Sequence, residues 1–134
     1  MTEDESAQAY RLELESFEAK HRGNRLASRA SATPPGLVIS IDGSLDSSNA
    51  NDFQKLVLNG LGEAIRMGGL ILNLERLNYA SSAGIGSFTV ILVETRKRQL
   101  PLYLHRMPKS VASVLDLLGF TSFFAFIDDY EARR

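Results

Sequence analysis

Two adjacent serines, Ser81 and Ser82, stand between an apolar run and a stretch with helical spacing. A serine hydroxyl at such a point can attack a substrate, accept a phosphoryl group, or cap the helix that follows. Ligands and modifications concentrate there on α/β folds, because the carboxyl end of a sheet strand meets the positive end of a helix. The other residues of the chain decide between these three roles.

Attack by a serine requires a general base and a strained turn around the nucleophile. The nucleophile turn of α/β hydrolases has glycine two residues before and two residues after the serine. Around Ser82 those positions hold Ala80 and Gly84. The two histidines, His21 and His105, fall in an expected loop and at an expected strand end. We therefore expect that the protein is not an enzyme.

The composition excludes several other functions. The chain has 134 residues, no cysteine, 23% charged residues and a formal net charge of −1, which argues against nucleic-acid binding. It contains no complete phosphate-binding glycine motif and no metal-ligand spacing, so we expect no cofactor and no metal. No apolar run is long enough to span a membrane, and the acidic N-terminus lacks the order of a signal peptide. We expect a cytoplasmic protein without membrane contact.

Alternating strand and helix patterns predict an α/β fold. Apolar runs at 37–42, 70–74 and 100–104 predict strands, and aromatic residues at 123–127 predict a last strand. Helical spacing predicts helices within 49–67, after Ser82, and after Pro108, with a short polar helix from Asp129. Ser47 or Ser48 is expected to cap the first of these helices.

The N-terminal third is harder to interpret. Partial alternation at 8–17 predicts a half-buried strand at the edge or outside of a sheet. Residues 18–36 are basic and rich in Ser, Ala and Pro, and they predict a mobile insertion between the first two strands. The whole chain, 1–134, is expected to form a single domain around a largely parallel sheet.

Phosphorylation and capping remain as roles for the serines. A phosphoryl group on Ser82 would add roughly −1.5 to −2 charges at a helix N-terminus, where backbone N–H groups and the helix dipole tolerate it. A partner surface pressed on the same place would not tolerate an unpaired dianion. An ordinary helix cap explains the same two residues, so the residues alone leave both interpretations open.

Three blocks of the chain form a recognisable pattern. The central block is LILNLERLNYASSAGIGSF, with LVISIDGSLDSSNANDF before it and LPLYLHRMPKSVASVLDLLGF after it. Together the three blocks resemble the STAS domain of bacterial anti-sigma factor antagonists. The resemblance covers about residues 37–127, with 8–17 as the first strand. It implies a mixed sheet of four to five strands with helices packed mainly on one face.

The resemblance also implies a function and its residues. The unphosphorylated protein would bind a GHKL-type serine kinase that doubles as an anti-sigma factor, phosphorylation would release that partner, and a PP2C-type phosphatase would restore binding. By position the phosphorylated residue is Ser82, and Asp46 lies beside the phosphorylated loop. The implied partner-binding residues are Asp46, Ser81, Ser82, Ala83, Gly84 and Ile85.

Two departures from the family pattern leave alternatives. Many members have Asp where this chain has Ser81, so Ser81 is a rival phosphate acceptor. The basic insertion is not typical of the family and is compatible with a partner outside sigma-factor control. The alternative function is a STAS-like accessory or sensor module that binds a small molecule or nucleotide near Asp46 and Ser82.

Overall fold

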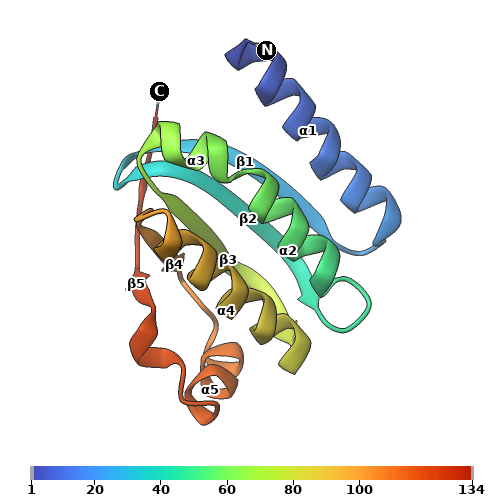
Figure 1. Cartoon of the computed structure of the whole chain (residues 1–134). Helices are drawn as coiled ribbons and strands as arrows, with labels where there is room; N and C mark the ends of the chain where they lie inside the picture. Colours follow the sequence, from blue (N-terminus) through green and yellow to red (C-terminus); the bar gives the residue numbers. More distant parts are fainter. Residues whose placement is uncertain (1, 134) are drawn as a thin grey trace.

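The computed structural model describes residues 2–133, which form a six-stranded mixed sheet with helices over one face (Figure 1). The strand order is β5-β4-β3-β2-β1-β6. In chain order the elements are α1 (Glu3–Lys20), β1 (Arg25–Thr33), β2 (Pro35–Leu45), α2 (Ala50–Asn59), α3 (Leu61–Met67), β3 (Leu70–Ala80), α4 (Ser82–Lys97), β4 (Leu102–His105), α5 (Lys109–Leu117), the 3₁₀ helix η1 (Thr121–Phe123), β5 (Ala125–Ile127) and β6 (Glu131–Ala132).

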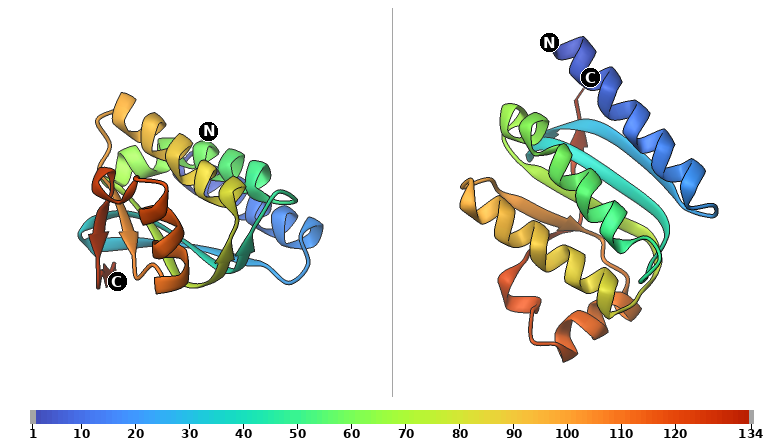
Figure 2. Two further views of the ribbon diagram at one scale, coloured as in Figure 1. Left: turned by 90° about the horizontal axis from the view of Figure 1, so that it is seen from below. Right: turned by 45° about the vertical axis from the view of Figure 1, so that its right-hand side comes forward.

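The predicted α/β class and the helices on one face are confirmed, with six strands in place of four to five. Strands β2, β3, β4 and β5 are parallel to one another, whereas β1 runs antiparallel to β2 and to β6. The apolar strand residues and the helices α1 to α4 enclose one core (Figure 2). At its centre the rings of Phe53 in α2 and Phe88 in α4 meet edge to face, with centroids 6.4 Å apart.

The predicted strand at 8–17 is wrong, because these residues lie in helix α1. Tyr10, Leu14 and Phe17 are buried, and their spacing of four and three residues is helical. Leu12, which completed the apparent alternation, is 60% exposed. Helix α1 therefore lies on the helical face of the sheet, against β1 and α2 (Figure 1).

The predicted mobile insertion at 18–36 is also wrong for most of its length. Strand β1 occupies it and pairs with β2 from Arg25 opposite Asp42 to Ala32 opposite Pro35. Within β1 only Leu26 and Ser31 are buried. A strand with so few buried apolar residues has no hydrophobic alternation that the sequence could reveal.

The helical pattern at 49–67 is divided at Gly60 into α2 and α3. The Tyr10 hydroxyl donates a hydrogen bond to the Leu56 carbonyl oxygen at 3.0 Å. A Cβ at Gly60 would lie 2.7 Å from the same hydroxyl. The glycine thus leaves room for an aromatic residue of α1, and burial raises the pKa of that tyrosine well above its usual range.

The polar helix predicted from Asp129 is wrong, because the chain forms β6 there. Segment 128–130 leaves β5 and passes the face of the sheet opposite the helices, where the Tyr130 hydroxyl accepts a hydrogen bond from Asn73 Nδ2 at 3.3 Å. Arg106 Nε donates to the Asp128 carbonyl oxygen at 2.7 Å. Strands β5 and β6 are the two edges of the sheet, and the short segment 128–130 joins them. The two edges must therefore lie close together, so the sheet is curled.

Candidate functional site

The ends of β2 and β3 meet at the first turn of α4. The Ser81 backbone N–H donates to the Leu45 carbonyl oxygen at 2.9 Å. A Cβ at Gly84 would lie 2.7 Å from the same oxygen, so this turn packs on β2 only because residue 84 lacks a side chain. Asp46 follows Leu45 directly. The structure therefore brings Asp46 and Ser82 to the same end of the sheet.

The two serines have different environments. Ser81 is the N-cap of α4, half-buried, and its hydroxyl oxygen accepts a long hydrogen bond from the Gly84 N–H at 3.4 Å. Ser82 is the first helical residue and is exposed, and within residues 2–133 no hydrogen bond involves its hydroxyl. Ser81 therefore caps the helix, whereas the Ser82 side chain is exposed at its first turn.

The other predicted contact residues divide in the same way. Ala83 is exposed beside Ser82, but Gly84 and Ile85 are buried, Ile85 to 1% exposure. Only the exposed and half-buried members can touch a partner directly. Gly84 and Ile85 hold the first turn of α4 against the core.

Strand β3 is irregular just before this turn. Its register against β2 shifts between Asn73 and Arg76 and again between Leu77 and Tyr79, so β3 carries an extra residue at each place. Such bulges bend a strand and re-aim its side chains. Tyr79, a large aromatic residue close to Ser82, is 55% exposed. The sequence patterns did not single it out.

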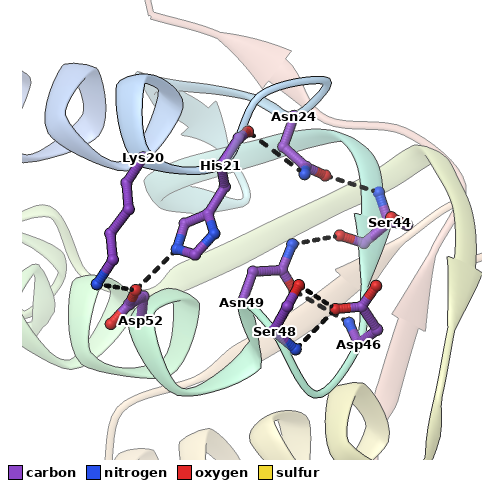
Figure 3. A network of polar contacts seen from close by, with 8 residues as sticks. All are labelled: Lys20, His21, Asn24, Ser44, Asp46, Ser48, Asn49 and Asp52. Atoms are coloured by element: carbon purple, nitrogen blue, oxygen red, sulfur yellow. Dashed lines mark hydrogen bonds and ion pairs between the residues drawn. The ribbon is translucent and has the colours of Figure 1, made fainter.

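The loop after β2, residues 46–49, is held by its own side chains (Figure 3). Asp46 Oδ1 accepts from the Ser48 N–H at 2.8 Å and from the Ser48 hydroxyl at 2.6 Å, and these bonds lower the pKa of the Asp46 carboxyl. Asn49 is buried; its Oδ1 accepts from the Asp46 N–H and its Nδ2 donates to the Ser44 carbonyl oxygen. The predicted serine cap is replaced by an Asp-centred turn, for which the spacing Asp-x-Ser is a signal.

A second set of polar contacts joins the end of α1 and the turn after it to the end of β2 and to α2. Asn24 Oδ1 accepts from the Ser44 N–H at 2.8 Å, and the His21 ring lies 2.7 Å from Asp52 Oδ2 in α2 (Figure 3). Lys20 Nζ lies 3.0 Å from the same oxygen. The hydrogen bond from His21, followed by that from Lys20, lowers the pKa of the Asp52 carboxyl. None of these residues was a sequence candidate for the site.

Neither histidine contacts Ser82. His21 pairs with Asp52, and His105 is buried in β4 with Nδ1 3.0 Å from Asn73 Oδ1. Among the residues that the structure describes, no three His, Asp or Glu side chains are grouped so that they could hold a metal ion. In the same part of the chain, no helix is long and apolar enough to cross a membrane.

The start of α4 suits an anion. Its first turn contains no acidic residue, and the helix dipole places partial positive charge there. The backbone N–H groups of the first helical residues have no partner within the helix, and the Ser81 hydroxyl satisfies one such group, that of Gly84. A phosphoryl group on Ser82 would meet the remaining donors. Asp46 supplies the nearest fixed negative charge of the adjoining loop.

Comparison with known proteins agrees with this architecture. The family model of the STAS domain matches residues 28–132. A Bordetella bronchiseptica protein named "Putative anti-sigma factor antagonist BtrV" is 28% identical over 96 residues, which are 72% of this chain and 81% of that protein.

Two solved structures share the fold at 19% sequence identity, and each covers 78% of this chain. One is described as the anti-sigma factor antagonist SpoIIAA in its unphosphorylated form, with a TM-score of 0.62 and 89% of that chain covered. The other is Moorella thermoacetica RsbS with a serine-to-glutamate substitution, with a TM-score of 0.64 and 87% covered. The family model spans most of the sequence, from β1 to β6, and the chain belongs to the STAS domain family.

Proposed function

We propose that this protein is an anti-sigma factor antagonist that works by partner switching, with Ser82 as the phosphorylated residue. The observation that carries the proposal is the exposed Ser82 hydroxyl at the N-terminus of α4, which has no hydrogen bond to any residue that the structure describes. The names of the similar proteins support the regulatory role. The partners we propose are a GHKL-type serine kinase that is also the anti-sigma factor, and a PP2C-type phosphatase, acting in the cytoplasm.

The proposal makes Ser82 a substrate and not a nucleophile. With His21 and His105 engaged elsewhere, neither histidine is placed to activate its hydroxyl. Ser81 is the weaker acceptor, because it is half-buried and bonds to the Gly84 N–H. A kinase that reaches Ser82 finds it on the surface and needs no unfolding of α4.

Phosphorylation would act at the interface and not through the fold. The helix N-terminus stabilises an exposed negative charge by about 0.3–1 kcal/mol. A bound partner would desolvate the dianion without supplying a counter-charge, which costs several kcal/mol. The modified protein therefore keeps its structure and loses its partner.

The proposed contact surface lies around Ser82. It comprises Ala83, the half-buried Ser81 and Asp46, and the exposed Tyr79. Tyrosine is enriched among the residues that dominate binding energy in protein interfaces. We expect Tyr79→Ala to weaken the complex while leaving the fold intact, because the ring is more than half exposed.

The experiment is phosphorylation by the cognate kinase with ATP, followed by peptide mass spectrometry. We expect one phosphate on the peptide that contains both serines, lost in Ser82→Ala and retained in Ser81→Ala. A protein that gains no phosphate at either serine contradicts the proposal. Phosphate that persists in Ser82→Ala and disappears in Ser81→Ala assigns the switch to the other serine.

The sensor alternative predicts a ligand site near Asp46 and Ser82. A hollow of about 310 Å³ is lined by Glu18 of α1 and by residues of β1, β2 and β3, among them Arg25, Asp42 and Arg76, but by neither Asp46 nor Ser82. This position gives the alternative no support from the switch region. Calorimetric titration with ATP and ADP distinguishes the two, because the partner-switching proposal predicts no binding of nucleotide to the isolated protein.

A further inference from the structure

Helix α1 precedes the segment that matches the STAS family model, which begins at residue 28. It is nevertheless built into the domain. Tyr10, Leu14 and Phe17 are buried in the common core, and the Tyr10 hydroxyl bonds to α2 beside Gly60. Its C-terminal end lies at the same end of the molecule as the 46–49 loop and the start of α4 (Figure 1).

The C-terminal end of α1 is fixed to the first turn of α2. The His21 ring lies against the Phe17 ring, with centroids 4.7 Å apart, and bonds to Asp52 at 2.7 Å. The His21 side chain is only 10% exposed, so this contact is largely shielded from water. Lys20 adds an ion pair to the same carboxylate. Because Asp52 lies in α2, these contacts fix where α2 starts relative to α1.

The turn after α1 continues to the 46–49 loop through Asn24. Asn24 Oδ1 accepts from the Ser44 N–H, and the Ser44 carbonyl oxygen accepts from Asn49 Nδ2. Asn49 Oδ1 then accepts from the Asp46 N–H at 2.9 Å. The absence of a side chain at Gly43 leaves the space that the Asn24 amide fills. An unbroken series of hydrogen bonds therefore runs from the turn to Asp46 (Figure 3).

We infer that α1 and the turn after it position the 46–49 loop for the partner that recognises Ser82, with His21 and Asn24 as the positioning residues. The inference rests on the proposed function for the identity of that partner, but the geometry of the loop is independent of it. Asp46 is the loop residue beside the start of α4, and its backbone is held by Asn49. Without Asn24 the residues before the loop lose the hydrogen bond to the Ser44 N–H. The loop is then less ordered, and the partner binds more weakly because binding must order the loop first.

The chain offers a matched control. Asn59, at the other end of α2, joins α2 to α1 through its amide: its Nδ2 donates to Glu13 Oε1 at 3.2 Å. Asn24→Ala and Asn59→Ala thus remove the same chemical group, but only Asn24 bonds to the backbone of β2 before the 46–49 loop. Asn24→Asp is the conservative variant, because a carboxylate oxygen still accepts from the Ser44 N–H.

The first measurement needs no partner. Amide hydrogen exchange reports local opening, and we expect Asn24→Ala to accelerate exchange at Asp46 and Ser48 by about tenfold. A merely local effect would change the Ser44 amide alone. Asn59→Ala should leave all three amides unchanged, and Asn24→Asp should restore protection. Unchanged exchange at Asp46 and Ser48 in Asn24→Ala overturns the inference.

The second measurement uses the kinase that phosphorylates Ser82. We expect Asn24→Ala to raise KM about tenfold with kcat little changed, because loop order affects binding and not phosphoryl transfer. Equal KM values for Asn24→Ala and Asn59→Ala overturn the inference. If no serine is phosphorylated in any variant, the proposed function fails, while faster exchange in Asn24→Ala still supports the positioning of the loop.

Discussion

A pair of adjacent serines lies at or just before the start of two helices of this domain, and the two starts differ. Before α2, the Asp46 carboxylate accepts hydrogen bonds from both the N–H and the hydroxyl of Ser48, and the buried Asn49 accepts one from the Asp46 N–H. Before α4, Ser81 makes one long capping bond and Ser82 makes none among the described residues. At the start of α2 the polar groups bond to one another. At the start of α4 the Ser82 hydroxyl and some of the first backbone N–H groups have no such partner among the described residues.

The comparison separates a structural serine from a candidate for modification. The sequence pattern is nearly the same in both places, Ser-Ser followed by a helix. The neighbours decide the role: an aspartate two residues before Ser48 engages its hydroxyl, whereas Ala80 precedes Ser82 by the same distance.

The largest effect is expected where α4 packs on β2. Gly84→Ala places a Cβ 2.7 Å from the Leu45 carbonyl oxygen, so we expect a loss of about 1–3 kcal/mol of stability and displacement of Ser82. Gly86→Ala is the control, because no atom lies within 4 Å of its Cβ, and it should gain up to about 1 kcal/mol. Urea unfolding of both variants measures the contrast; equal stabilities would refute this packing.

Removing the side-chain amide of Asn49 before α2 should lower the stability of the protein more than removing the capping hydroxyl of Ser81 before α4. Asn49→Ala removes two hydrogen bonds from a side chain that is 2% exposed, and we expect a loss of about 2 kcal/mol. Ser81→Ala should cost about 0.5–1 kcal/mol, because its single capping bond is long. Chemical denaturation gives both values. A larger loss for Ser81→Ala would reverse the comparison.

Negative charge should have opposite effects at the two starts. Ser82→Asp adds a carboxylate at an exposed helix N-terminus and should leave the melting temperature unchanged or slightly raised. Ser48→Asp removes the hydroxyl that donates to Asp46 and adds a like charge beside it, and should lower the melting temperature by roughly 3 °C. Calorimetry of the two variants distinguishes them. The same shift in both would show that the two starts are equivalent.

The smallest effect is expected in acid. The pKa values of Asp46 and Asp52 lie below their ordinary value of 3.8 in the folded protein, so the unfolded chain takes up protons first as the pH falls. The stabilisation is complete above about pH 4 and is lost as the pH drops through the lower folded values. Asp52→Asn should reduce this loss, as measured by urea midpoints at pH 7 and pH 3.

The same acid step tests the two starts against each other. The first turn of α4 has no acidic residue, whereas α2 has Asp52 in its first turn. Hydrogen exchange at pH 3 should therefore increase at the start of α2 before the start of α4. Earlier loosening of α4 would contradict the assignment of the titrating contacts.

The sequence predicts best where burial is strong and local. Strands β2 and β3 and helix α4 follow from dense apolar runs and from the Gly68-Gly69 stop. The sequence does not predict helix α1, because its buried face consists only of Tyr10, Leu14 and Phe17. With the exposed Leu12 between them, these residues give the apolar and polar alternation of a strand. Strand β1 could not be predicted because its own residues are mostly small or polar, and only its pairing with β2 makes it a strand.

The site shows the same limit. The sequence predicts that Ser82 and Asp46 lie at the same end of the sheet, because each follows a recognisable strand and matches a position in the family pattern. Asn24 could not, since its contact with Ser44 joins residues that are 20 positions apart across the α1–β1 turn. The burial of Ile85 likewise depends on how α4 packs and not on the motif around it.

The central claim is that Ser82 is a switch whose charge breaks a complex without disturbing the fold. The most direct test compares the dissociation constant of the kinase complex for the unmodified and the Ser82-phosphorylated protein, with melting temperatures measured on the same samples. We predict that phosphorylation weakens binding by at least about a hundredfold while the melting temperature changes by less than about 2 °C. Equal dissociation constants, or a loss of binding accompanied by unfolding, would contradict the account.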